Sequence, residues 1–292
     1  MSKGKYTKAK KRMPLAYYLI LFTLIAVVIG CSWYLGSYFL KSQAQAEEYD
    51  DLAALVDSLR ETAPTVEQDW DRPGQTEPDG LEGQVLPVIP PAKFKDIHDE
   101  NGILLEYAPL YEKNPDMIGW MTIEGTRINY PVMQTPDRPD FYLERDFDRN
   151  YNPWGCLYAR EECDLEEPSD NVTIYGHHMR DGSMFAGLSA YTSRDFWQEH
   201  RYIRFDTIWQ HHTYEIFAVF TTTASEGKGF DYHNFINAAD EQAFDTFIAK
   251  CLSLSLYATD IVPEYGDKII CLSTCEYSQT NGRLVIAARR IY

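Results

Sequence analysis

Two cysteines near the C-terminal end of the chain have the chemistry of a nucleophile. Cys271 and Cys275 lie in and at the end of the apolar run DKIICLST, directly before the polar stretch EYSQTNG. If this run is a strand, Cys271 lies inside its apolar part, where a cysteine behaves as a small buried hydrophobe. Cys275 ends the run, where a side chain is anchored by the strand and reachable from a loop. Cys275 is therefore the candidate nucleophile, provided that a basic or cationic group activates its thiol.

An arginine follows on the far side of the next turn. Arg283 comes after SQTNG and opens a second apolar run, RLVIAARRI. In an antiparallel hairpin, Arg283 would lie near the end of the strand that carries Cys275. A guanidinium accepts no proton at neutral pH, but it can stabilise a thiolate or the oxyanion of a tetrahedral intermediate. Taken alone, Arg283 fits an exposed arginine at a strand edge better than a catalytic one.

One of the seven histidines occupies a similar position. The run NVTIYGHHM indicates a strand that ends at a glycine, and His177 follows this glycine as Cys275 follows its own strand. His177 is the candidate proton donor and acceptor, with its neighbour His178 as the alternative. His211 and His212 lie among polar turn residues, and we expect both to be solvated.

The elements that must position these side chains are mainly strands. Seven runs are rich in β-branched and aromatic residues and often alternate apolar with polar positions. They are 118–125, 127–134, 171–178, 202–208, 213–223, 268–274 and 283–291. Helices are expected at 103–114, where Pro109 is a possible break, at 193–200 and at 239–256. In the last helix, Phe244, Phe247, Ile248 and Cys251 share a face. This pattern predicts a mainly-β domain, either a barrel or a sandwich.

The N-terminal part of the chain predicts a membrane anchor. Residues 14–40 carry no charge and suffice to span a bilayer. Basic residues precede this stretch and acidic residues follow it, which predicts that residues 1–13 are cytoplasmic and the rest lies outside. A cleaved signal peptide would have a shorter apolar region. A lipoprotein processed at Cys31 would turn polar there, whereas this apolar run continues. The sequence favours an uncleaved signal-anchor.

Three further segments follow the anchor. Residues 41–62 contain strong helix formers, with Leu52, Leu55, Val56 and Leu59 on one apolar stripe, and predict a juxtamembrane helix. Residues 63–92 contain six prolines and many acidic residues, as a linker does. Residues 93–292 then form the folded domain.

The charge of the chain bears on its partners. Seven of the 27 basic residues precede residue 42. Residues 42–292 therefore contain 20 basic and all 44 acidic residues, which gives this part a net charge of −24. This acidity argues against binding nucleic acid through its phosphates. Cys156 and Cys163 would form a disulfide only if a loop brings them together, and no pair of C-x2-C motifs indicates a zinc site. We expect no metal and no cofactor.

Together, the three candidate residues resemble the sortase family, most closely its class B. The resemblance rests on strand-YGHHM, then about 100 residues, then strand-LSTC-E, and then an arginine on the next strand. Sortases end the nucleophile strand in T-L-x-T-C, whereas this chain has Cys271 in place of the leading threonine. The expected helices at 103–114 and 239–256 are also class B traits. The resemblance implies a membrane-anchored cysteine transpeptidase of Gram-positive bacteria with an eight-stranded β-barrel.

The resemblance also implies roles for residues. Cys275 would be the nucleophile, His177 the acid and base, and Arg283 the group that stabilises the substrate carbonyl. Ser273 and Glu276 flank the nucleophile and would line the substrate groove. Leu143 would line it too, and residues 223–235 are expected to form a wall.

The reaction that this family performs defines the expected partners. The enzyme would cleave the C-terminal sorting signal of a secreted protein through a thioacyl intermediate on Cys275. It would then transfer that protein to an amine of a peptidoglycan precursor. Two alternatives stay open at this point: a non-enzymatic, membrane-anchored acidic binding domain, and a cell-wall peptidase with a Cys-His pair.

Overall fold

The computed structural model describes residues 15–62, 94–225, 227–276 and 281–292. The predicted cytoplasmic tail (1–13) and linker (63–92) lie outside these residues, and so do the side chains of Glu61, Thr62 and Glu276. The chain divides into two compact units, Met1–Glu48 and Tyr49–Tyr292. The boundaries expected for the tail, anchor, linker and catalytic domain stay predictions.

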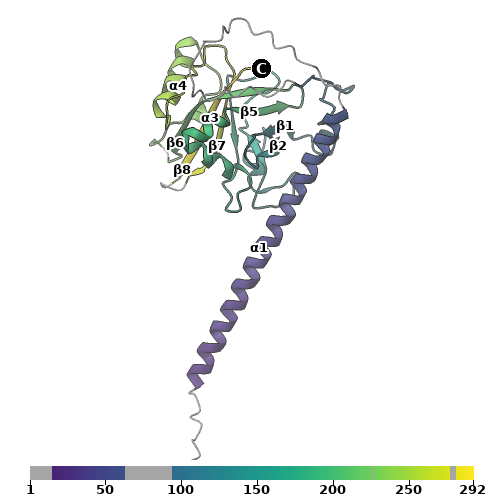
Figure 1. Ribbon diagram of the computed structural model, residues 1–292, viewed down its shortest axis with the longest axis vertical. Coiled ribbons are helices and arrows are strands. Elements are labelled where there is room, and N and C mark those ends of the chain that lie inside the picture. The colour runs from purple at the N-terminus through teal and green to yellow at the C-terminus, as the bar shows by residue number, and fades with distance from the viewer. Residues whose placement is uncertain (1–14, 63–93, 226, 277–280) are drawn as a thin grey trace, which may run out of the picture. The chain divides into compact units, whose positions relative to one another are not determined.

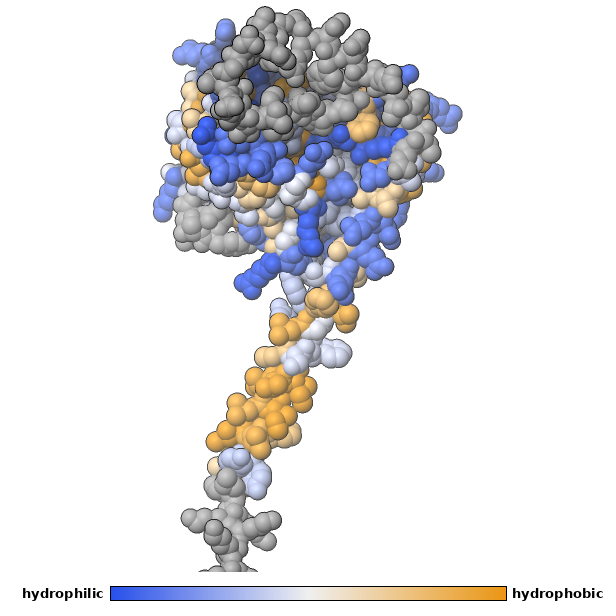
Figure 2. Space-filling view, viewed as in Figure 1, coloured by the Kyte–Doolittle hydropathy of each residue, from blue (hydrophilic) through white to orange (hydrophobic). Residues whose placement is uncertain are grey.

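The first unit is helical where it is described. The helix α1 runs from Leu15 to Thr62, so the predicted apolar span and the predicted juxtamembrane helix form one continuous element. Its first part is long and apolar enough to cross a membrane by length and composition. Apolar side chains cover the face of this part that Figure 2 shows, and most of its large apolar residues between Leu15 and Leu40 are exposed, as expected for a helix that lies in lipid rather than in a protein core.

The second unit is a closed barrel of eight strands, which confirms the expected fold class (Figure 1). The strands follow one another around the barrel in the order β1-β2-β3-β4-β7-β8-β6-β5. They are β1 (Met117–Thr122), β2 (Asn129–Met133), β3 (Leu157–Ala159), β4 (Asn171–Tyr175), β5 (Tyr202–Thr207), β6 (Thr213–Thr223), β7 (Ile269–Glu276) and β8 (Gly282–Arg290). The sequence missed only β3, because three residues are too few to show an alternating pattern.

Short helices connect and cover the strands. They are α2 (Ala108–Lys113), α3 (Arg194–Glu199), α4 (Glu241–Leu254) and the 3-10 helices η1 (Phe141–Glu144), η2 (Phe185–Thr192) and η3 (Tyr232–Asn234). The helix expected at 103–114 begins only at Ala108, because Pro109 fits the first helical turn and not its interior. The helix expected at 239–256 is α4, which begins after Asp240, whose side chain accepts a hydrogen bond from the backbone N–H of Ala243. The apolar face predicted for α4 is buried.

β7 and β8 are deeply buried along most of their length. Ile270, Cys271, Leu272, Val285 and Ile286 are all fully buried, so both faces of these strands are covered. This explains why their sequences are continuous apolar runs rather than alternating ones. The barrel therefore holds the ends of β7 and β8 on a rigid, well-packed support.

The last part of α1 belongs to the second unit and packs on it. Tyr49, Leu52 and Val56 are buried, at 3%, 8% and 0% exposure. Leu55, which the sequence placed on the same stripe, is 39% exposed. The buried face is thus turned slightly from the predicted one, because Tyr49 completes it in place of Leu55.

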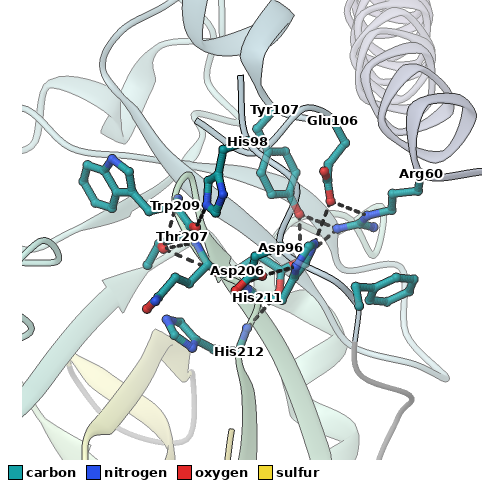
Figure 3. A network of polar contacts seen from close by, with 12 residues as sticks. Arg60, Asp96, His98, Glu106, Tyr107, Asp206, Thr207, Trp209, His211 and His212 are labelled. Carbon is teal, nitrogen blue, oxygen red and sulfur yellow. Dashed lines mark hydrogen bonds and ion pairs between the residues drawn. The ribbon is translucent and has the colours of Figure 1, made fainter. Parts of the chain in front are cut away.

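A buried polar network fixes this helix end to the barrel (Figure 3). Arg60 donates from Nη2 to Asp206 Oδ2 at 2.8 Å and to the Tyr107 hydroxyl. Asp206 is completely buried, and it also accepts from the Tyr107 hydroxyl at 2.7 Å. Burial, together with Asp206, raises the pKa of Tyr107, so its hydroxyl stays protonated and donates. Arg60 Nε lies 3.5 Å from Glu106 Oε1.

His211 extends this network, and the expectation that it is solvated is wrong. It is 5% exposed. Its Nδ1 lies 2.7 Å from Asp96 Oδ1 and its Nε2 lies 2.7 Å from Glu106 Oε1. Since ionised carboxylates only accept hydrogen bonds, both ring nitrogens donate and His211 is an imidazolium. Burial would lower the pKa of His211, but its bond to Glu106 and the charge of Asp206 outweigh burial and raise it.

Candidate active site

Three neighbouring strands bring the predicted catalytic residues together. β7 pairs with β8 in antiparallel register, and Cys275 lies directly opposite Arg283. On its other side, β7 pairs with β4 in parallel register, with Tyr175 opposite Ser273. His177 follows two residues after Tyr175, as Cys275 follows two residues after Ser273. Because neighbouring strands lie about 4.8 Å apart, His177 and Arg283 come to flank Cys275.

Backbone contacts fix the loop that carries His177. The backbone N–H of Gly176 donates to Ser273 O at 3.2 Å, and Thr274 Oγ1 donates to Gly176 O at 2.8 Å. A Cβ atom on Gly176 would lie 2.6 Å from Leu157 and 2.7 Å from Phe185. Only glycine therefore fits before His177 without displacing the neighbouring side chains.

His177 makes one hydrogen bond that sets its orientation. Its Nε2 donates to the backbone carbonyl of Leu143 at 2.7 Å. This leaves Nδ1 as the nitrogen that can exchange a proton with a substrate. The Leu143 carbonyl is itself closely packed, since a Cβ atom on Gly155 would lie 2.4 Å from it. The backbone at Gly155 has φ of 61°, which also favours glycine.

The alternative histidine is placed differently. His178 pairs through its backbone with Met184 and lines a separate cavity with Met179 and Arg180. In the parallel register of β4 and β7, position 177 corresponds to Cys275, and His178 lies one residue further along. The register thus favours His177 as the partner of Cys275.

The two cysteines of β7 differ in their access to solvent. Cys275 is partly exposed, whereas Cys271 is fully buried. Burial, with smaller contributions from Cys251 and Cys163, raises the pKa of Cys271 well above its usual value. Cys271 therefore stays a neutral thiol in the core. Cys156 and Cys163 are buried as well, and neither forms a disulfide.

Among the residues that the structure describes, the Arg283 side chain makes one hydrogen bond, from Nη1 to the carbonyl of Gly282 at 3.0 Å. Within the described part of the chain, no carboxylate forms an ion pair with it. Its charge reaches His233, whose pKa is lowered mainly by burial, then by Arg160 and more weakly by Arg283. The guanidinium is therefore available to a substrate beside Cys275.

The residues expected to line a groove have distinct environments. Ser273 is 1% exposed, and its Oγ lies 2.6 Å from the Tyr232 hydroxyl. The side chain of Leu143 is 38% exposed, beside the carbonyl that binds His177. The side chain of Glu276 lies outside those that are described. Sequence reasoning did not single out Tyr232, although it falls in the predicted wall segment 223–235 as part of η3.

Comparisons with known proteins agree with this arrangement. Residues 121–291 match the Sortase domain family. The chain is 30% identical to Sortase B of Staphylococcus aureus over 190 residues, which are 64% of this chain and 75% of that protein. It is 32% identical to Sortase B of Listeria monocytogenes over 188 residues, 64% of this chain and 74% of that protein. A solved Staphylococcus aureus sortase B-substrate complex superposes with a TM-score of 0.67 at 23% identity, covering 86% of this chain and 98% of that one.

The chain therefore belongs to the sortase family, and its relatives place it in class B. Members of this class are cysteine transpeptidases that anchor surface proteins, and this chain is an enzyme of that kind. The resemblance drawn from LSTC and YGHHM is thus confirmed. The assignment of a non-enzymatic binding domain is set aside.

Proposed function

We propose that the enzyme is held in the membrane by residues 14–40 and that its reaction takes place at Cys275, His177 and Arg283. The observation that carries the assignment is the strand register, which sets Arg283 opposite Cys275 and His177 level with it on the other side. The partial exposure of Cys275 and the absence of an ion pair at Arg283 among the described residues support it further.

The first half of the reaction breaks a peptide bond. The Cys275 thiolate attacks the carbonyl carbon, and the Arg283 guanidinium stabilises the negative charge that develops on the carbonyl oxygen. The intermediate collapses as the carbon–nitrogen bond breaks. The leaving amine takes a proton from Nδ1 of the His177 imidazolium, and a thioester on Cys275 remains.

The second half forms a new peptide bond. An amine attacks the thioester carbonyl, and the now neutral His177 accepts the proton that this amine loses. Cys275 leaves as the thiolate, which restores the starting state of the enzyme. The chain's own residues balance each proton and each bond, so the chemistry requires neither a metal nor a cofactor.

The expected substrates are a secreted protein with a C-terminal sorting signal and an amine of a peptidoglycan precursor. Leu143, Ser273 and Glu276 are the proposed groove residues, and we add Tyr232 because it bonds to Ser273. The proposed topology, with residues 1–13 in the cytoplasm and the barrel outside, would bring enzyme, secreted substrate and lipid-linked acceptor to the same membrane face.

A peptide-cleavage assay tests these roles. The full chain in detergent micelles is incubated with quenched peptides that carry different sorting signals, with and without a short glycine peptide as acceptor. Cys275→Ala, His177→Ala and Arg283→Ala are expected to lose turnover, whereas Cys271→Ala retains it. Mass spectrometry should detect a thioacyl adduct on Cys275 and an amine-linked product.

Each contrary outcome has a definite meaning. Turnover that persists in Cys275→Ala contradicts the mechanism. Cleavage that yields only the hydrolysed product, at every acceptor concentration, contradicts the proposed transfer to an amine.

A further inference from the structure

The barrel has a second concave site, at the opposite end of β8 from Arg283. β6 pairs with β8 along its whole length, with Thr222 opposite Arg283 and Tyr214 opposite Arg290. Arg290 lies seven residue steps after Arg283, which corresponds to about 23 Å in a strand. A cavity of about 370 Å³ lies at the Arg290 end, which is within the size range of small-molecule sites.

Aromatic side chains form one part of the mixed polar and apolar lining of this cavity. Phe205 and Tyr214 contribute to it and are 1% and 5% exposed, so they belong to the rigid core. Trp209 adds a third ring at the rim. His98 fixes that rim, since its Nε2 donates to the Trp209 carbonyl at 2.6 Å (Figure 3). The site can therefore pack a flat apolar group without rearranging the barrel.

Arg290 carries the permanent positive charge of the described lining, beside polar groups that include Thr207, Gln210 and His212. His212 was expected to be solvated, but it is 8% exposed and lines the cavity. Burial, and then the charge of Arg290, lowers the pKa of His212 to about 4, so it is neutral at physiological pH. Glu166 is the one acidic residue of the lining, and it is exposed at the rim.

Arg290 lacks the partners that its neighbour has. Arg289 lies 3.3 Å from Glu215 and 3.8 Å from Asp267. The Arg290 side chain forms no hydrogen bond or ion pair with any residue that the structure describes, Glu166 included. A guanidinium presents a planar fork of donors that matches a carboxylate in two-point contact. In a strongly acidic domain, an arginine without such a contact inside an aromatic cavity is available to a ligand.

We propose that this cavity binds a small carboxylic acid with an apolar or aromatic body. The carboxylate would pair with the Arg290 guanidinium, and the body would pack on Phe205, Tyr214 and Trp209. The site is separate from Cys275, and the proposal does not depend on the reaction proposed above.

A calorimetric titration tests the proposal with the full chain in lipid nanodiscs and empty nanodiscs as the blank. The probes are phenylacetate, benzoate and indole-3-acetate, each compared with its neutral amide. At least one acid is expected to saturate one site per chain and to bind at least tenfold more tightly than its amide. Arg290→Met should weaken the acid at least tenfold and leave the amide unchanged.

Arg289→Met is the matched control, because it removes the same charge from the next residue of β8 outside the cavity. It should bind the acid as the wild type does. The proposal is overturned if no acid gives saturable heat, if acid and amide bind equally in the wild type, or if Arg290→Met binds as tightly as Arg289→Met. The comparison of acid with amide needs no variant, so it holds even where a substitution disturbs folding.

Discussion

The catalytic residues and the buried network around Asp206 differ in what binds their charged groups. At the active site, His177 and Arg283 bond to backbone carbonyls, at Leu143 and Gly282. In the buried network, Arg60 and His211 bond to buried side-chain oxygens (Figure 3). A charge that is satisfied by carboxylates and hydroxyls in the interior is committed to the fold, and removing one partner is costly. A charge oriented only by a carbonyl keeps most of its capacity for a substrate.

Asp206→Ala should give the largest change in stability. It leaves the Arg60 guanidinium and the Tyr107 hydroxyl buried without their shared acceptor. The free energy of unfolding is expected to fall by about 3–5 kcal/mol, measured by urea titration. The kcat of the folded fraction should change little, because Asp206 bonds to Arg60, Tyr107 and His212 and not to the catalytic residues. A large loss of kcat in that fraction would show that the buried network and the active site are coupled.

Arg283→Gln should show the reverse behaviour. The rate constant kcat/KM is expected to fall about 10²–10³-fold, as when one oxyanion donor is removed. The free energy of unfolding should stay close to that of the wild type, because the carbonyl of Gly282 is the one hydrogen-bond partner of the Arg283 side chain within the described residues. Arg289→Gln, on the same strand, is the control and should retain activity. An Arg283→Gln variant that loses stability but keeps its activity would contradict both expectations.

Gly155→Ala tests whether backbone packing orients His177. The new methyl group would lie 2.4 Å from the Leu143 carbonyl, which must then move away from its hydrogen bond with His177. We expect kcat to fall about tenfold, since a small misplacement of a catalytic group is costly, while the KM for the peptide changes less. Gly102→Ala is the control, because it also has positive φ but has open space around its Cβ position. Equal kcat values in the two variants would contradict this role of the carbonyl.

The smallest expected effect is the contribution of His211 to the pH dependence of the free energy of unfolding. Its pKa is raised in the folded state, so its stabilisation is fully present below the unfolded value of about 6.5 and is lost as pH rises through the folded value. The groups that face it are Asp96, Glu106 and Asp206. The pKa of Glu106 is lowered, so the stability that Glu106 contributes is lost as pH falls rather than as pH rises. Unfolding free energies of wild type and His211→Gln should converge by about 1 kcal/mol as pH rises, whereas parallel curves would exclude the imidazolium.

The sequence predicted the catalytic residues far better than the buried network, for a physical reason. LSTC and the following arginine are neighbours in one hairpin, so local pattern and turn length nearly determine their pairing. The burial of His211 depends on Asp96 and Glu106, which are 115 and 105 residues away along the chain. The polar stretch around His211 carries no sign of those partners, and a polar turn is ordinarily solvated.

Other misses have the same origin. β3 has only three residues and is defined by its partners β2 and β4 rather than by its own pattern. Tyr232 could be placed in a wall segment from composition, but its bond to Ser273 needs the folded η3. The helix expected at 103–114 was too long at its start, because Pro109, noted as a possible break, lies in the first turn of α2.

The pairing of Cys275 with Arg283 also bears on how this enzyme can change in evolution. Side chains of a strand alternate between its faces, so a shift of β8 by one residue along β7 would exchange the two faces. Such a shift would remove the arginine from Cys275 and would misplace the buried Val285 and Ile286 at the same time. A register shift that separates the reactive pair would therefore also disrupt the core. Loss of activity with an intact barrel is thus accessible to lineages mainly through substitutions.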